Sequence, residues 1–240
     1  MYDPIETEIS FTTLKQISDE CKKRSIPIAI IGGWATYFYV NETYRRAFGK
    51  DYMGSRDIDI CFDHSKEKEF YELITELGFT KDGYFFRWEK IYNRETKKFI
   101  TPEEAKNEQI FNLIRIFLDI FCDRETNILK SWCLDPLKNM KFSIKDNYNV
   151  TDIGTLLALK CIALFERDKA DKENKDACDL YALIVYGGQK ISMTQLLHKA
   201  IEKILNRSDL LYYISQHVLL DSSRQNIVQH ILKGKLENKF

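Results

Sequence analysis

An apolar run that ends in two glycines and is followed by two closely spaced aspartates constrains the fold of this chain most. Residues 26–31 (IPIAII) are rich in β-branched side chains, which predicts a buried strand entering a tight turn at Gly32 and Gly33. Farther along, residues 56–62 (RDIDICF) alternate charged and apolar side chains, which predicts a second strand. Its acidic face would carry Asp57 and Asp59, and acidic residues are disfavoured in strands.

Asp57 and Asp59 form an i, i+2 pair, so their carboxylates leave the same face of the predicted strand about 7 Å apart. That spacing suits a shared divalent cation, and Mg²⁺ prefers oxygen ligands supplied by a few carboxylates and substrate phosphates. Asp119 is the candidate third ligand, because it interrupts the apolar strand predicted over residues 110–121 and an unpaired buried carboxylate is costly. The competing interpretation is an Asp-x-Asp pair that ends a strand at a solvated edge.

The order of the predicted elements indicates an α+β (α/β) fold with two parts. A mixed sheet flanked by helices is expected over residues 1–145, as a core domain, and a helical domain over residues 146–240. In the first part the patterns predict helices at 11–24, 34–46 and 66–77, and strands at 26–31, 56–62, 84–92 and 110–121. In the second part they predict helices at 151–167, 174–186, 192–205, 209–219 and 223–235, with Thr151 and Ser192 as N-caps.

Composition narrows the class of protein. The 36 basic and 36 acidic residues cancel, which argues against an overall electrostatic footprint for nucleic acid. No apolar segment approaches membrane-spanning length, and the first residues lack the pattern of a secretory signal. The six cysteines form no Cys-x-x-Cys pair and the four histidines form no recognisable set, so we expect reduced, mostly buried thiols in a cytoplasmic protein.

The segments IIGGWA, SRDIDI and LDI together resemble the DNA polymerase β-like nucleotidyltransferase superfamily. Its pattern is a strand ending in Gly-Gly or Gly-Ser, an Asp-x-Asp pair and a third acid on another strand. The resemblance implies that Gly32 and Gly33 contact nucleotide phosphates, and that Ser55 belongs to the same nucleotide site. It also implies that the catalytic residues are the three aspartates that hold Mg²⁺, Asp57, Asp59 and Asp119. The spacer between Gly33 and Asp57 is longer than in compact members of the superfamily.

A second block, LLALKCIALFERDKADKENKDACDLYALI (residues 156–184), resembles the helix pair of the abortive-infection AbiE-type toxins. The resemblance implies nucleotide contacts, with ATP as one candidate, for Lys160 and Lys175, and a functional role for Asp176 and Asp179. It further implies a nucleoside triphosphate substrate, an acceptor hydroxyl on tRNA or protein, and an antitoxin partner. Two alternatives stay open: a small-molecule acceptor, as in the antibiotic nucleotidyltransferases, and a non-catalytic nucleotide-binding module.

Two further features each allow two interpretations. Lys160 falls within the apolar stripe of the helix predicted at 151–167, so it either extends outward along the helix or points into a cleft to meet triphosphate. Residues 85–99 mix basic and aromatic side chains, which suits an RNA acceptor and equally suits an exposed amphipathic hairpin.

Overall fold

The structure, a computed structural model, describes residues 3–127, 129–130, 134–166 and 170–237. The chain forms two compact units. Unit 1 comprises Met1–Ala35 and Met53–Thr151, and unit 2 comprises Thr36–Tyr52 and Asp152–Phe240. The division expected from the sequence differs in two ways: it separates the chain earlier, at residue 146, and it does not anticipate that residues 36–52 pack with the later helices.

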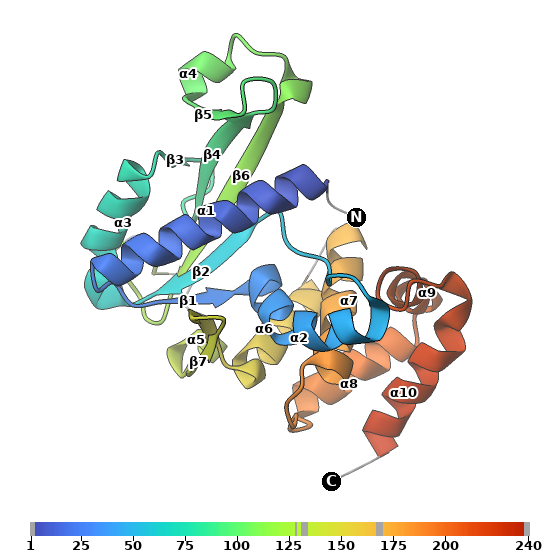
Figure 1. Ribbon diagram of the computed structural model, residues 1–240. Helices are drawn as coiled ribbons and strands as arrows, with labels where there is room; N and C mark the ends of the chain where they lie inside the picture. The colour runs from blue at the N-terminus through green and yellow to red at the C-terminus, as the bar shows by residue number, and fades with distance from the viewer. Residues whose placement is uncertain (1–2, 128, 131–133, 167–169, 238–240) are drawn as a thin grey trace. The chain divides into compact units, whose positions relative to one another are not determined.

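Unit 1 contains one mixed sheet, with strands in the order β3-β4-β6-β2-β1-β8-β7 and β5 paired with β4 (Figure 1). The pairs β2/β6 and β1/β8 are parallel, and the remaining pairs are antiparallel. The strands are β1 (Ile28–Ile31), β2 (Ile58–Phe62), β3 (Thr80–Lys81), β4 (Arg87–Asn93), β5 (Lys98–Ile100), β6 (Leu113–Cys122), β7 (Phe142–Lys145) and β8 (Tyr148–Thr151). Together with the flanking helices this confirms the expected α+β class.

The β7–β8 hairpin is the main element that the sequence patterns missed. Its two-residue turn, Asp146 and Asn147, has φ angles of 48° and 67°, which aspartate and asparagine tolerate better than most residues. The turn returns the chain so that β8 pairs in parallel with β1. The expected boundary at residue 146 therefore falls inside a hairpin of the sheet.

Helix α1 (Pro4–Lys23) contacts β6 and α3 (Glu67–Glu76) in unit 1. The Asp3 side chain caps α1 by accepting from the Ile5 N–H, a common device at helix N-termini. Trp34 donates to Ser10 over 3.0 Å and stacks on Phe11, so α1 is fixed beside the turn that follows β1. The short helices α4 (Pro102–Ala105) and α5 (Asp135–Lys138) complete the unit.

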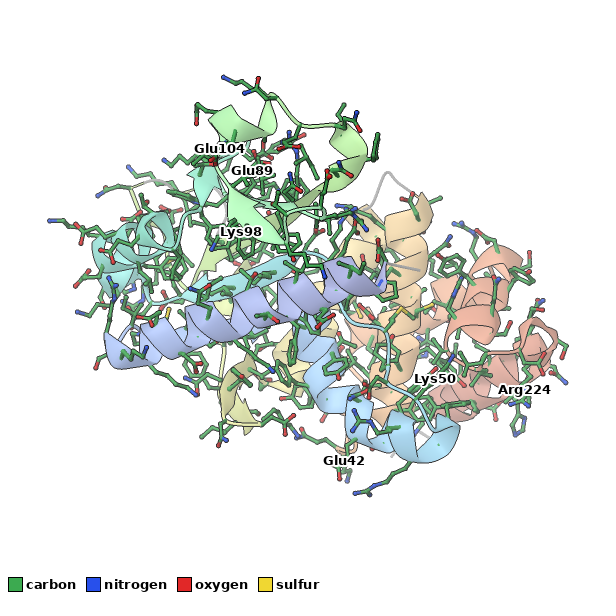
Figure 2. All side chains as sticks on the ribbon, turned by 45° about the horizontal axis from the view of Figure 1, so that its top comes forward. Glu42, Lys50, Glu89, Lys98, Glu104 and Arg224 are labelled. Carbon is green, nitrogen blue, oxygen red and sulfur yellow. The ribbon has the colours of Figure 1, made fainter. Side chains whose placement is uncertain are left out.

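Around β4, β5 and α4 the charged side chains are of both signs, as Figure 2 shows with Glu89, Lys98 and Glu104. Glu89 pairs with Arg115 over 2.8 Å, and Glu104 completes a capping box with Thr101. The mixture agrees with the zero formal charge of the whole chain.

Unit 2 is helical. Its elements are α2 (Gly32–Phe48, whose first four residues belong to unit 1), α6 (Ile153–Glu166), α7 (Ala170–Tyr186), α8 (Gln195–Leu205), α9 (Ser208–His217) and α10 (Gln225–Glu237). The predicted helices are confirmed, although Arg167, the predicted end of the first, lies outside the described residues. Two N-caps differ: the cap of α8 is Thr194, and Asp152 accepts from the Thr155 N–H at the start of α6. Thr151, the expected cap, belongs to β8 instead.

Buried thiols occur in both units. Cys21, Cys61, Cys122, Cys161 and Cys178 are free and buried, as expected, and Cys133 lies outside the described residues. Burial raises the pKa of both Cys21 and Cys161 to about 12. Within the described chain, every helix is too short or too polar to span a membrane.

Candidate functional site

A single row of residues crosses four neighbouring strands of unit 1. Ile31 on β1 pairs with Asp59 on β2, Asp59 pairs with Asp119 on β6, and Asp119 pairs with Arg87 on β4. Directly opposed residues on neighbouring strands point from the same face of a sheet, at the strand spacing of about 4.8 Å. The structure therefore brings two of the three predicted aspartates together, with an arginine beside them. We call Asp59, Asp119 and Arg87 the acidic row.

The turn after β1 lies directly against the first carboxylate of the acidic row. Gly32 has φ of +66°, and a methyl group placed on it would lie 2.0 Å from Oδ2 of Asp59 and 2.6 Å from its carboxyl carbon. Glycine is therefore required at this position for two reasons. The backbone is left-handed, and the Asp59 side chain occupies the space that a larger residue would need. Helix α2 begins at this same residue, so the carboxylate of Asp59 lies beside the start of a 17-residue helix.

Asp57, whose charge helps to raise the pKa of Arg87, directly precedes β2 and stands two residues before Asp59. Its side chain is partly exposed, and Nε of Arg56 lies 3.4 Å from its Oδ1. Asp59 is also partly exposed, whereas Asp119 is only 8% exposed. Exposure thus increases from Asp119 toward the Asp-x-Asp pair.

Arg87 holds the carboxylate of Asp119 in a fork. Its Nε donates to Oδ1 over 2.6 Å, and its Nη2 donates to Oδ2 over 2.7 Å, the bidentate geometry in which Arg–carboxylate pairs are strongest. This hydrogen bonding, followed by the charges of Asp119, Asp57 and Asp82, raises the pKa of Arg87 although burial opposes the shift. The sequence analysis did not identify Arg87.

The signal for Arg87 is weak in the sequence. It lies in the strand predicted at 84–92, within the basic and aromatic segment 85–99. Its pairing with Asp119 depends on the register between β4 and β6, and a shift of one residue would turn Arg87 to the opposite face.

The other two predicted residues of unit 1 lie just after β1 and just before β2 in the sequence. Gly33 is the second residue of α2 and is buried. Ser55 is 4% exposed and lies in the segment before β2. That segment is held close to α1, because a methyl group on Gly54 would meet Thr7 at 2.5 Å and the Trp34 ring at 2.8 Å. The long spacer between Gly33 and Asp57 is occupied mainly by α2, which continues to Phe48.

The chemistry of the three aspartates suits a hard divalent cation, although they are not among the described sets whose ligand atoms all lie within 4.8 Å of one another. The carboxylates are those of Asp57, just before β2, Asp59 on β2 and Asp119 on β6. They offer only oxygen ligands, which Mg²⁺ prefers. The recess that Gly32 leaves for the Asp59 carboxylate keeps this ligand at the start of α2. A helix start favours negative charge, including that of phosphate groups.

The predicted lysines lie in unit 2, in a cluster that we call the lysine cluster: Lys160, Lys175, Asp176 and Asp179. Lys160 on α6 approaches Asp176 over 2.9 Å and Asp179 over 2.6 Å, both on α7. Lys175 donates to Asp179 over 3.0 Å, and the Tyr52 hydroxyl donates to the other oxygen of Asp179 over 3.0 Å. The ammonium group of Lys160 is buried and shared by two carboxylates, an arrangement that neither alternative considered for this lysine anticipated.

Two buried members of the lysine cluster, Lys160 and Asp179, favour their charged forms. Burial alone would lower the pKa of Lys160, but the charges of Asp176 and Asp179 outweigh it, and the net shift is upward. Burial would likewise raise the pKa of Asp179, and the charges of Lys160 and Lys175 reverse the shift to a net lowering. Lys160 and Asp179 therefore each stabilise the charged form of the other.

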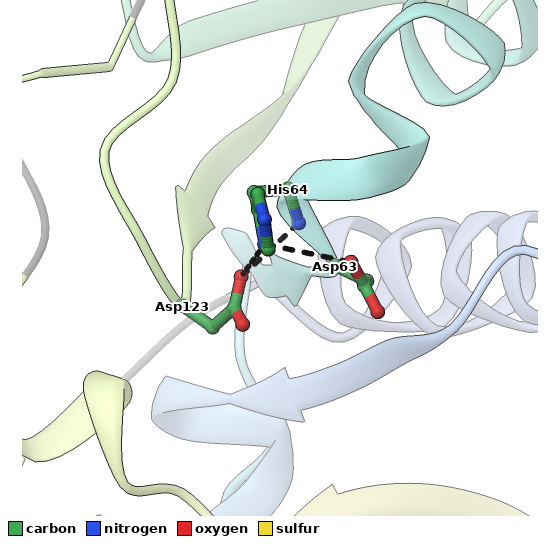
Figure 3. A group of neighbouring side chains, drawn as sticks. All are labelled: Asp63, His64 and Asp123. Atoms are coloured by element: carbon green, nitrogen blue, oxygen red, sulfur yellow. Dashed lines mark hydrogen bonds and ion pairs between the residues drawn. The ribbon is translucent and has the colours of Figure 1, made fainter.

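A third charged group lies directly after the C-terminal ends of β2 and β6, the strands that carry Asp59 and Asp119. Figure 3 shows Asp63, after β2, and Asp123, after β6, on either side of His64, the only three-residue set of candidate metal ligands found among the described residues. Nδ1 of His64 lies 3.3 Å from Oδ1 of Asp123 and 3.6 Å from Oδ1 of Asp63. The sequence analysis assigned no role to this histidine.

Local hydrogen bonds explain both of these carboxylates. Asp63 caps the short helical turn that begins at His64 by accepting from the Ser65 N–H, and Asp123 accepts from the His64 N–H. All three side chains are partly exposed. Backbone hydrogen bonds therefore account for the positions of Asp63 and Asp123 without a bound cation.

Comparison with known proteins shows which solved structures share this fold. No profile of a known protein family matches the sequence, and no curated protein matches it significantly. Among solved structures, an antigenic nucleotidyltransferase-like protein from Paracoccidioides brasiliensis aligns over 87% of this chain and 93% of its own, with a TM-score of 0.50 and 16% identity. JHP933 from Helicobacter pylori aligns over 100% of this chain and 96% of its own, with a TM-score of 0.50 and 13% identity.

A third structure, of the antibiotic-resistance factor ANT(2'')-Ia, aligns over 96% of this chain and 95% of its own at 11% identity; its TM-score of 0.43 is too low to argue from. The likeness to the first two establishes a shared fold at low identity. This chain therefore has the fold of a nucleotidyltransferase-like protein.

Proposed function

We propose that this protein is a Mg²⁺-dependent nucleotidyltransferase that moves a nucleoside monophosphate from a nucleoside triphosphate to an acceptor hydroxyl. The observation that carries the proposal is the pairing of Asp59 with Asp119 on adjacent strands, with the Gly32 turn packed against Asp59. The shared fold supports the class of reaction, and the Asp-x-Asp pair supplies the chemistry it needs.

The residues of unit 1 would divide the reaction between them. Asp57, Asp59 and Asp119 would hold the cation, and the backbone at Gly32 and Gly33 would approach the phosphates at the start of α2. Bound Mg²⁺ would supply charge stabilisation for the attacking and departing oxygens. The acceptor oxygen forms a bond to the α-phosphorus while the bond to the bridging oxygen of the β-phosphate breaks, and pyrophosphate leaves.

Asp119 would orient the acceptor hydroxyl or take its proton, since it is the carboxylate farthest along the row from the Gly32 turn. Three further assignments rest on the resemblance. Ser55 would contribute to nucleotide binding in unit 1, and Lys160 and Lys175 would contact phosphate, with ATP as one candidate nucleotide. The burial of the lysine cluster adds a structural role to both lysines.

The finer proposal concerns the acceptor. The resemblance of residues 156–184 to the AbiE-type helix pair supports a toxin that modifies tRNA or a protein and is restrained by an antitoxin. Expression of the wild-type chain in bacteria should then arrest growth, and the Asp59→Asn variant should not. Growth unaffected by the wild-type chain would favour a small-molecule acceptor.

Two radiolabelled nucleotides test the proposal, one with ³²P in the α-phosphate and one with ³²P in the γ-phosphate. With Mg²⁺ and candidate acceptors (tRNA, protein extract and small hydroxyl compounds), label from [α-³²P]NTP should appear in a product. Label from [γ-³²P]NTP should leave as pyrophosphate. Incorporation of the γ-label would instead indicate phosphoryl transfer, and release of both labels without product would indicate hydrolysis.

One observation favours a second candidate, a non-catalytic nucleotide-binding module. Both oxygens of Asp119 accept hydrogen bonds from Arg87, so this carboxylate already has a cationic partner. A module of this kind would bind nucleotide and transfer neither label.

A further inference from the structure

Arg87 stands where a bound cation would compete with it. Both oxygens of Asp119 accept from its guanidinium, at 2.6 Å and 2.7 Å. The side chains of the pair are 18% and 11% exposed, so water screens this interaction poorly. A divalent cation can gain Asp119 as a ligand only by sharing its oxygens with this arginine or by displacing it.

The position of Arg87 is built into the sheet. Its backbone is held in register opposite Asp119, in the antiparallel pairing of β4 with β6. Its guanidinium lies 4.8 Å from the ring centroid of Phe117 and 5.8 Å from those of Tyr84 and Phe86. Arginine stacks well on aromatic faces and loses little when it is taken from water. The fork therefore persists without a ligand.

The charges also identify Arg87 as the counter-charge of the site. Asp57 and Asp59 lie two residues apart, Asp59 pairs with Asp119 on the neighbouring strand, and Oδ1 of Asp57 also lies 3.4 Å from Nε of Arg56. Closely spaced carboxylates repel one another in the absence of a cation. Arg87 offsets this repulsion at Asp119, the most buried of the three, where an unpaired charge would cost most.

We propose that Arg87 is a positioning residue that sets the divalent-cation affinity of the acidic row by holding both oxygens of Asp119. This inference rests on the proposed function. Without nucleotide the row binds a divalent cation weakly, because the positive charge of Arg87 repels it and the Asp119 oxygens are engaged. The phosphates of a nucleoside triphosphate add ligands and negative charge, so the cation binds tightly only together with nucleotide.

The test is a calorimetric titration of Mn²⁺, used as a probe for Mg²⁺, into the wild type and three variants without nucleotide. Arg87→Gln removes the charge, and repulsion between a divalent and a monovalent cation a few ångströms apart is worth about tenfold in affinity even at the dielectric constant of water. We therefore expect the Kd for Mn²⁺ to fall about tenfold. Arg87→Lys keeps the charge but cannot hold both oxygens of Asp119 in a fork, so its Kd should lie between those of Arg87→Gln and the wild type.

Arg115→Gln is the matched control. Arg115 forms the other arginine–carboxylate pair between β4 and β6, with Glu89, four residues along β6 from Asp119. Its removal deletes the same charge from the same pair of strands at a greater distance, so the Kd for Mn²⁺ should not change measurably. Equal changes of the Kd for Mn²⁺ in Arg87→Gln and Arg115→Gln would overturn the inference. The change would then follow from the net charge of the protein and not from the position of Arg87.

The outcomes separate the two levels of proposal. An unchanged or higher Kd in a folded Arg87→Gln variant overturns the role of Arg87 and leaves the proposed function standing. No Mn²⁺ binding by the wild type, with or without nucleotide, overturns the proposed function itself. If Arg87→Gln fails to fold without metal, Arg87→Lys decides the question, and a Kd as high as that of the wild type, or higher, overturns the inference.

Discussion

The two charged clusters of this protein balance their charges differently. The lysine cluster of unit 2 sets two ammonium groups against two carboxylates, all in contact within about 3.0 Å, and its Asp179 is fully buried. The acidic row of unit 1, with Asp57, sets three carboxylates against two arginines, the forked Arg87 and the Arg56 beside Asp57, and stays partly exposed at its acidic end. A balanced buried cluster stabilises its charges by internal pairing, whereas an acidic, partly exposed one can gain stability from a cation.

The largest effect should come from breaking the unbalanced cluster. Asp59→Asn should lower the rate of nucleotide transfer at least about a hundredfold, because a catalytic cation contributes several kcal/mol to the transition state. The melting temperature without metal should stay the same or rise, since one repelling carboxylate is lost. Transfer assays and thermal melting on the same preparation measure both.

Asp63→Asn is the control for that variant, because it removes a carboxylate from the other end of the same strand. It should leave transfer intact. Equal loss of activity in both variants would mean that the Asp63, His64 and Asp123 group, and not the acidic row alone, serves the reaction.

Breaking the balanced cluster should act on stability. Lys160→Met leaves Asp176 and Asp179 buried with less positive charge, and removal of one partner from a buried ion pair costs about 3 kcal/mol. Urea denaturation measures the loss of free energy of unfolding. Lys68→Met, at an exposed lysine that lies 3.8 Å from Glu72, should change it by less than about 0.5 kcal/mol. A loss below about 1 kcal/mol in Lys160→Met would contradict the balanced-cluster account.

Two glycine variants test whether the turn at Gly32 supports the acidic row. Gly32→Ala must adopt a positive φ and must also displace Asp59, so it should cost about 2 kcal/mol and weaken Mn²⁺ binding. Gly78, in the same unit, has φ of +85°, and a methyl group on it would meet only the Lys90 side chain, at 3.5 Å. Gly78→Ala should therefore cost only the backbone strain, about 1 kcal/mol. Identical stability and Mn²⁺ affinity in the two variants would show that the Asp59 contact is unimportant.

The smallest expected effect is that of pH on the lysine cluster. The pKa of Asp179 is lowered from 3.8, so its stabilisation is present above that value and is lost as pH falls below it. The pKa of Lys160 is raised from 10.5, so its stabilisation is present below that value and is lost at still higher pH. The difference in unfolding free energy between the wild type and Lys160→Met should therefore be flat from pH 5 to pH 9. A slope within that range would mean that a member of the cluster titrates there.

Much of the fold was predictable because its elements have local signals. The apolar run before Gly32, the alternation around Asp59 and the helical periodicities after residue 152 all correspond to elements of the structure. The β7–β8 hairpin was missed because its four-residue strands are short and β7 places Phe142 and Ile144 in exposed positions, so no buried alternation marks it.

The candidate site was predictable only in part. The i, i+2 spacing identified Asp57 and Asp59, and the isolated charge in an apolar strand identified Asp119. Arg87 and the partners of Lys160 depend on strand register and on helix packing, which connect residues far apart in the chain. Local patterns carry no information on either.

The most direct test of the central claim is a calorimetric titration of each of the four nucleoside triphosphates, with and without Mg²⁺, into the wild type and Asp59→Asn. We expect at least one nucleotide to bind the wild type more tightly with Mg²⁺, because the cation links the carboxylates to the phosphates. We expect this enhancement to disappear in Asp59→Asn. Binding of none of the four nucleotides, or an enhancement by Mg²⁺ that survives in Asp59→Asn, would contradict the account.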